Sequence, residues 1–410
     1  MTILYQSKMC NSEREERDEV DRIPSKDRAT NWDVAGFVFS IISHIADVFF
    51  DCNVAYRYYA NKQLAYFFAT LAFIIVPAII NTAFSVRMYV LDPGNANTST
   101  NLTKRFTRKG MCILFVLIFQ LAPILRYFDA LKYALRSQKA EKNHDVENQR
   151  KYYELMVKED SDVALLRVLE CFLEAAPQLI LQLAIIFQSH GREMEGKNTF
   201  TIVHQLLSIG SSFVSMAWAM ASYQRLLRVS LKTKNNVSWA GTFVHFMWHF
   251  LVTVSRILCI SVIASIYPTE TILIIIGHWF LMTLWLACSS GTNDFCNQNS
   301  MYDFLFYCIL GAVYIFTHVV LVAGPTCCKY VIFYCVLFAE NTIANVVWIV
   351  SADEELREKV YYLPIILLNV IPFFLGLIFM LLYYKVFHPN LNTGYKPQRT
   401  AVVTPESPTS

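Results

Sequence analysis

Apolar segments of about 20 residues recur along the whole chain, and they constrain its fold more than any other feature. A helix needs about this length to cross the hydrocarbon core of a bilayer. Of the 410 residues, 55% are hydrophobic. The sequence therefore predicts an all-α polytopic membrane protein. The ten candidate segments are residues 34–59, 64–91, 111–135, 161–188, 200–222, 237–267, 271–289, 301–323, 329–350 and 361–387.

Basic residues between these segments indicate which loops face the cytosol, because Lys and Arg are enriched on that side. Basic clusters occur in residues 104–109, 136–158 and 225–234. If the first two clusters are both cytosolic, segment 111–135, whose apolar run is short and interrupted, cannot be a simple crossing. We predict a re-entrant helical segment there and a second one in the other half. That leaves about eight transmembrane helices and puts both termini in the cytosol.

The order of the segments predicts two pseudo-repeats of five. Glu340, Asn341 and Asn345 place polar groups in the ninth segment where the fourth has glutamates. The polar N-terminal residues lack the apolar core of a signal peptide, so the first span is expected to direct insertion. The predicted parts are a disordered cytosolic regulatory tail (1–32), an N-terminal membrane repeat (33–222), a cytosolic linker (223–236), a C-terminal membrane repeat (237–387) and a disordered cytosolic tail (388–410).

A polar stripe crosses the fourth apolar segment. Glu170, Glu174, Gln178 and Gln182 are spaced four residues apart, so on a helix they lie one above the other. A carboxylate at bilayer depth costs roughly 2.5 kcal/mol or more, and it must therefore face water, a counter-charge or a polar ligand. The stripe indicates a hydrophilic face inside the membrane.

The first apolar segment carries acids in a similar arrangement. Asp33, Asp47 and Asp51 return to within about 40° of one helical face. We predict a continuous track for polar groups, and Arg126, Arg167 and Arg256 are its candidate counter-charges. The alternative is that the acids form structural ion pairs that hold helices together. The predicted track residues are Asp33, Asp47, Asp51, Glu170, Glu174 and Gln178.

The sequence predicts no enzyme, no cofactor and no metal site. Residues 191–198 resemble a phosphate-binding loop, but Asn198 replaces the required Ser or Thr and no strand precedes the loop. His245 and His249 share a helical face without a third ligand, so aromatic packing is expected. The net charge of +3 is too small and scattered to indicate nucleic-acid binding.

Two groups of residues resemble the hallmark of the XK-related membrane proteins. They are the run from Asp162 through Arg167, Glu170, Glu174, Pro177 and Gln178, and the pair Asp47 and Asp51 before Arg57-Tyr58. The resemblance covers about residues 33–387. It implies two related halves, eight spanning helices and re-entrant elements. It also implies a phospholipid scramblase of the plasma membrane, which exposes phosphatidylserine on dying cells without ATP after a caspase removes a terminal peptide. The family's acidic ladder corresponds here to Asp33, Asp47, Asp51, Glu170 and Glu174.

The N-terminal tail contains the tetrapeptide Asp18-Glu19-Val20-Asp21, which looks like the preferred substrate of executioner caspases. The surrounding residues are almost wholly polar, which predicts an accessible, disordered segment. Cleavage after Asp21 makes Arg22 the new N-terminus, whereas caspases generally favour a small residue there. No Asp follows Asp353, so the C-terminal tail has no such site, and in this the chain is similar to a nematode cell-death member of the family. The alternative is a solvated acidic run.

Charge suggests how the tail acts. Residues 1–21 carry six acidic and three basic side chains. We expect this peptide to rest on a basic surface at Arg150 and Lys151 until cleavage frees that surface for anionic headgroups. The expected partners are phospholipids including phosphatidylserine and an executioner caspase, and an accessory membrane subunit is left open. An ion-coupled secondary transporter and a non-transporting membrane scaffold are the alternatives.

Overall fold

The computed structural model of the chain is helical throughout its described residues, and no strand occurs in them. The described residues are 28–90, 120–188, 199–230, 236–289, 300–319, 327–352 and 354–388. The predicted caspase site from Asp18 to Arg22 and the loop 191–198 lie outside these ranges.

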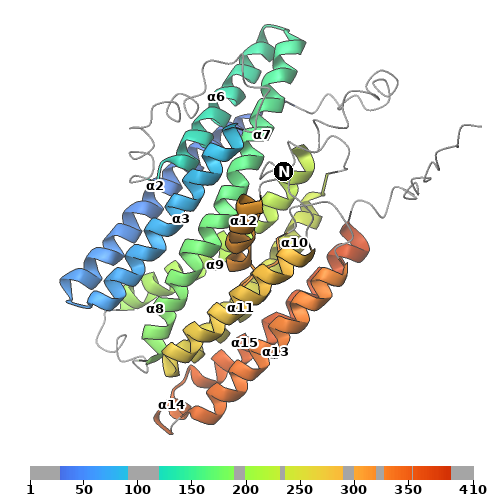
Figure 1. Cartoon of the computed structure of the whole chain (residues 1–410). Helices are drawn as coiled ribbons and strands as arrows, with labels where there is room; N and C mark the ends of the chain where they lie inside the picture. The colour runs from blue at the N-terminus through green and yellow to red at the C-terminus, as the bar shows by residue number, and fades with distance from the viewer. Residues whose placement is uncertain are drawn as a thin grey trace, which may run out of the picture.

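Eight helices of the described residues are long and apolar enough to cross a membrane. They lie roughly side by side in one bundle (Figure 1). This result confirms the predicted all-α polytopic membrane fold. The eight are α2 (Asn31–Ala60), α3 (Leu64–Val90), a continuous helix made of α7 (Val146–Glu170), the π-helical turn Cys171–Ala175 and α8 (Ala176–Gln188), α9 (Thr199–Ser230), α10 (Trp239–Ile266), α11 (Pro268–Ser289), α13 (Cys327–Ser351), and α15 (Tyr362–Leu382) with the π-helical turn Tyr383–Phe387.

Two further helices, α6 (Ala122–Lys142) and α12 (Ser300–Val313), are not among the eight. The 14 residues of α12 rise about 21 Å, which is less than the roughly 30 Å of a hydrocarbon core. These helices belong to the third and eighth of the ten apolar segments, which are equivalent places in the two halves. The sequence predicted a non-crossing element in the third segment and left the place of the second one open. Residues 111–119, the first arm of the predicted re-entrant hairpin, lie outside the described residues.

The helix that contains the polar stripe is longer than its apolar segment. Residues 161–188 were expected to be helical, but the helix runs from Val146 to Gln188, a length of 43 residues or about 64 Å. With α6 it forms a hairpin whose tip projects beyond the other helices (Figure 1). The extension is charged, so a search for apolar segments does not detect it. A short helix, α14 (Glu354–Glu358), connects α13 to α15.

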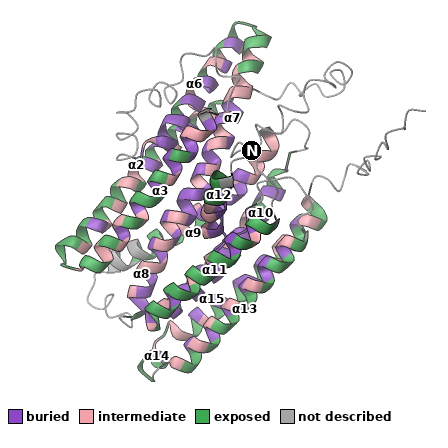
Figure 2. Cartoon of the chain, viewed as in Figure 1, coloured by how far each residue is buried: buried purple, intermediate pink, exposed green. Residues whose placement is uncertain are grey.

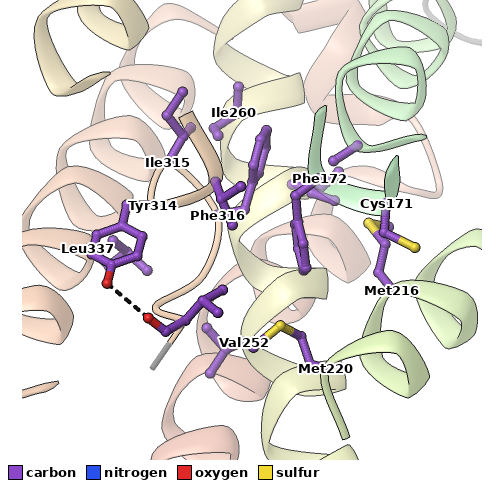
Figure 3. Close-up of a cluster of buried hydrophobic side chains, with 14 of the residues drawn as sticks. Cys171, Phe172, Met216, Met220, Val252, Ile260, Tyr314, Ile315, Phe316 and Leu337 are labelled. Atoms are coloured by element: carbon purple, nitrogen blue, oxygen red, sulfur yellow. Dashed lines mark hydrogen bonds between the residues drawn. The ribbon is translucent and has the colours of Figure 1, made fainter. Parts of the chain in front are cut away.

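The hydrophobic core joins both halves of the chain. Helix α10 is central, with 67% of its apolar stretch buried, whereas for α2 the value is 17%. Exposed residues lie mainly on the outward faces of the bundle (Figure 2). Figure 3 shows Phe172 of the first π-helical turn beside Phe316, which follows α12, and their rings stack with centroids 6.1 Å apart. The two halves therefore share one core.

Candidate functional site

The polar stripe lies where the long helix changes its winding. Pro177 has no N–H group, and its ring excludes the carbonyl oxygen of residue 173 from its usual place in an α-helix. The turn before it is π-helical, and the N–H of Ala176 donates to the carbonyl oxygen of Cys171, five residues back. Such turns are frequent at functional sites. Glu174 lies in this wide turn, and Glu170 lies immediately before it.

Glu170 meets two basic side chains inside the bundle. Its Oε1 atom lies 3.2 Å from Nδ1 of His44 on α2 and 3.5 Å from Nη1 of Arg167. The Arg167 guanidinium also lies 3.3 Å from Oδ2 of Asp47 and donates to Oγ of Ser215 on α9, at 3.2 Å. Arg167 therefore connects α2, α7 and α9, and it pairs with two of the predicted track acids.

A second group of contacts follows one turn further on. Asp51 on α2 faces Glu174 and Gln178, and Gln120 lies beside Glu174. The structure thus brings together five of the six predicted track residues, together with Arg167. The five are Asp47, Asp51, Glu170, Glu174 and Gln178, and we call them the acidic cluster.

Several polar atoms of the acidic cluster have no hydrogen-bond partner among the described residues. They are Oε2 of Glu170, Oε1 of Glu174 and Nε2 of Gln178, and all three are buried. Buried polar atoms are nearly always paired, so these atoms are suited to a polar ligand. The Asp47 side chain in front of them is 49% exposed. The acidic cluster therefore extends from the outer face of α2 into the bundle.

Asp33 lies apart from the acidic cluster. It is 14 residues before Asp47, which corresponds to about 21 Å along α2. Its Oδ2 atom accepts hydrogen bonds from the backbone N–H of Thr30 at 2.7 Å and from the Thr30 hydroxyl at 2.8 Å. Asp33 thus completes the capping box that begins α2. Its place in the track remains a prediction.

Two of the three candidate counter-charges contact acids outside the acidic cluster, so their role in the track remains a prediction. Arg126 is 1% exposed and contacts Glu159 and Asp162, at 3.0 Å each. Arg256 lies in the C-terminal half and contacts Glu340 at 2.6 Å. Sequence spacing shows which residues share a helix face, but it does not show which helices are neighbours, so these pairings could not be predicted.

Sequence reasoning missed His44 and Gln120. His44 is 1% exposed and precedes Asp47 and Asp51 by three and seven residues, which is the spacing of one helical face. That spacing was a usable signal. Gln120 has a positive φ of 50° just before α6, and nothing in the adjoining apolar run indicates a polar contact there.

An apolar cavity lies between α2 and α3, next to the acidic cluster. Its volume is about 540 Å³, and its lining is almost entirely apolar. Gln120, which contacts Glu174, is also part of this lining, so the cavity adjoins the polar groups. The other lining residues are Cys52, Ala55, Tyr56, Tyr59, Phe67, Leu71, Ile74, Ile75 and Ala78.

The fold and the site define a multi-pass helical membrane protein with a cluster of carboxyl and amide groups inside its spans. A family model described as XK-related protein matches residues 35–389, and the chain belongs to this family. It is 28% identical to Cell death abnormality protein 8 of Caenorhabditis briggsae over 387 residues, which cover 90% of this chain and 81% of that protein. Identity to the Caenorhabditis elegans protein of the same name is 27% over 410 residues, covering 94% and 87%. The family resemblance is therefore confirmed.

Proposed function

We propose that the chain is a phospholipid scramblase of the plasma membrane, in which lipid headgroups move along the acidic cluster while their acyl chains stay in the bilayer. One observation carries this proposal: Glu170, Glu174 and Gln178, close to the half-exposed Asp47, each have a buried polar atom without a hydrogen-bond partner in the described part of the chain. Such atoms can replace part of the hydration that a headgroup loses inside a membrane.

The energetics favour passive movement. A zwitterionic or anionic headgroup resists hydrocarbon for the same reason that an isolated charge does. Polar partners inside the spans lower that barrier in both directions, so lipid runs down its own gradient and no ATP is needed. The apolar cavity between α2 and α3 provides an adjacent surface for acyl chains.

The names of the relatives connect them with cell death. We extend this connection to the present chain and propose that it exposes phosphatidylserine on apoptotic cells after a caspase cleaves the peptide bond that follows Asp21. Contacts of the adjoining residues support this regulation. Arg28 lies 3.3 Å from Glu141 at the hairpin tip, Gln138 donates to the carbonyl oxygen of Ala29 at 3.3 Å, and Ala29 is buried.

Arg28 and Ala29, which directly follow the N-terminal tail in the sequence, contact the end of α6 at the hairpin tip. Arg150 and Lys151 are exposed near the beginning of α7, across the interhelical turn from Glu141. An acidic peptide that precedes Arg28 can reach them, as the charge pattern predicts. We propose that this peptide covers the basic surface in the cytosol and that cleavage uncovers it.

Reconstitution into liposomes with fluorescent lipids tests both parts of the proposal. Caspase-treated protein should make inner-leaflet lipid accessible from outside the liposome without an ion gradient. The Asp21→Ala variant should not do so after the same treatment. Asp27→Ala, which leaves the tetrapeptide intact, is the matched control and should behave like the unchanged chain. If uncleaved protein transfers lipid as fast as cleaved protein, the proposed activation by caspase cleavage is wrong. Ion-coupled solute uptake without lipid transfer indicates a transporter, and the absence of both activities indicates a scaffold.

A further inference from the structure

A buried histidine in the N-terminal half lies between a glutamate and a main-chain carbonyl group. The Nε2 atom of His44 is 3.0 Å from the carbonyl oxygen of Gln120, which immediately precedes the non-crossing segment of α6. Its Nδ1 atom is 3.2 Å from Oε1 of Glu170. His44 therefore connects the beginning of the α6 segment to the acidic cluster.

The C-terminal half contains a similar constellation, but here both ring nitrogens form hydrogen bonds, whereas Nδ1 of His44 lies within ion-pair distance of Glu170 without a hydrogen-bond partner among the described residues. The Nε2 atom of His278 on α11 is 3.2 Å from the carbonyl oxygen of Tyr314, which follows the non-crossing helix α12. Its Nδ1 atom is 2.7 Å from Oε1 of Glu340 on α13. His278 is 3% exposed. An arginine contacts the glutamate in each half, Arg167 in the first and Arg256 in the second.

The chemistry of these contacts fixes the number of protons. A carbonyl oxygen and a carboxylate oxygen only accept hydrogen bonds, whereas a neutral imidazole donates through one nitrogen. Each histidine satisfies both neighbours only if the imidazole and the carboxyl group together hold one proton more than a neutral imidazole beside a carboxylate. Without that proton, one of the two contacts has no donor.

We propose that His44 and His278 are positioning residues, each of which uses this shared proton to hold the inner end of a non-crossing segment against a glutamate of a spanning helix. The segment after α12 also packs against the long helix, because Phe316, two residues after Tyr314, stacks on Phe172, two residues after Glu170 (Figure 3). The effect of His44 on lipid movement rests on the proposed function. The proposal that His44 and His278 hold the α6 and α12 segments in place does not.

The sign of the pH dependence follows from the charged groups around each ring. Glu170, Arg167 and Asp47 face His44 from α7 and α2, whereas Glu340 on α13 and Arg256 on α10 face His278. Because the added proton supplies the second donor, the contact between His44 and Glu170 should be complete at lower pH and should be lost when that proton leaves as the pH rises.

Substitutions distinguish a histidine that holds its segment through a hydrogen bond from one that only fills space. Gln places an amide donor near the position of Nε2 without a titrating group, so His44→Gln and His278→Gln should keep the carbonyl contact at every pH. His44→Phe and His278→Phe fill the space but donate nothing. His245→Phe is the matched control, because the His245 ring is buried and packs against Trp248 and Tyr383.

Hydrogen–deuterium exchange of full-length protein in lipid nanodiscs measures the holding directly. At one pH, exchange in residues 120–125 should rise roughly tenfold or more in His44→Phe, and exchange in residues 314–317 should rise similarly in His278→Phe, because a hydrogen bond to a charged group is lost. The Gln variants should restore most of the protection, and the His245→Phe control should not change either segment.

The pH profile of lipid transfer by caspase-treated protein is the second measurement. The rate should fall as the pH rises in the unchanged chain, should be low at all pH values in His44→Phe, and should be nearly independent of pH in His44→Gln. Unchanged exchange in both Phe variants overturns the proposal whatever the transfer rates are. Altered exchange with an unchanged transfer profile overturns the positioning role of His44. If neither the unchanged chain nor any variant transfers lipid, the proposed function fails. The hydrogen–deuterium exchange data then still show whether His44 and His278 hold the two segments.

Discussion

The two glutamates that meet buried histidines differ in how completely their oxygens are paired. Both oxygens of Glu340 are engaged, Oε1 by His278 and Oε2 by Arg256. Glu170 shares Oε1 between His44 and Arg167, and its Oε2 has no hydrogen-bond partner in the described residues. A saturated carboxylate has little left to offer a ligand. This difference supports the proposal that the lipid site lies in the N-terminal half and that Arg256 and Glu340 form a structural pair.

The Asp51→Asn variant tests whether one carboxyl group of the acidic cluster contributes to lipid transfer. The amide of Asp51→Asn can still hydrogen-bond with Glu174, so the variant should fold, but the loss of one ionisable group should lower lipid transfer roughly tenfold, since this corresponds to about 1.4 kcal/mol. The fluorescent-lipid assay on cleaved protein measures this change. Asp33→Asn is the comparison. Its amide oxygen can still cap α2, so we expect a change of less than about twofold. Equal losses in both variants would extend the site to the helix end.

Arg126 tests the structural alternative for the remaining acids. Replacing it by Met removes the guanidinium from the buried Glu159 and the partly buried Asp162, which should destabilise the protein by about 3–5 kcal/mol. Thermal unfolding in detergent measures this change. Arg150→Met is the control, because its pair with Glu154 is exposed and should contribute about 0–1 kcal/mol. Similar melting temperatures for the two variants would show that the buried pair is not a structural element.

At the scale of helices, hydropathy predicted which helices exist better than it predicted where they begin and end. Apolar length identified all eight spanning helices, because crossing a bilayer requires it. It did not predict that α7 begins at Val146, since the first residues of α7 are stabilised by the N-cap Asp145 and by packing on α6 rather than by lipid. Four-residue spacing predicted the shared face of Glu170, Glu174 and Gln178, but the π-helical turn that carries Glu174 has no simple sequence signal beyond the nearby Pro177.

Close approach of two helices depends on a glycine. A Cβ atom at Gly376 of α15 would lie 2.7 Å from Cγ2 of Val252 and 3.2 Å from the carbonyl oxygen of Trp248, both on α10. Gly376→Ala should therefore cost roughly 1–3 kcal/mol, as overpacking does. At Gly210 of α9 no atom lies within 4 Å of the same position, so Gly210→Ala should stabilise the helix by about 0.5–1 kcal/mol. Denaturation in mixed micelles measures both changes, and equal signs would contradict this packing.

On the scale of the whole molecule, the two halves share one hydrophobic core. Phe172 is fully buried and stacks on Phe316 across the boundary between the halves. A second stack joins Phe84 of α3 to Phe306 of α12, with centroids 5.8 Å apart. The predicted pseudo-repeats therefore describe the order of the segments and not separate folding units. Sequence could not have predicted this, because neither aromatic pair follows from periodicity within one helix.

A double-mutant cycle measures the coupling between the halves. Phe172→Ala alone should destabilise the protein by about 3–5 kcal/mol. Combined with Phe316→Ala, the total should differ from the sum of the single changes by about 0.5–1.5 kcal/mol, because the aromatic contact is lost only once. Phe172→Ala combined with Phe49→Ala, on the exposed face of α2, should be additive. Strict additivity in both cycles would separate the halves energetically.

The long helix from Val146 to Gln188 has a consequence for experimental control of the protein. At about 64 Å it is roughly twice as long as the hydrocarbon core is thick, so a bilayer can enclose only part of it. An antibody fragment that binds its N-terminal end contacts the same continuous helix that carries Glu170 and Glu174. Such a reagent offers a way to test whether a contact at the hairpin tip changes the behaviour of those carboxyl groups.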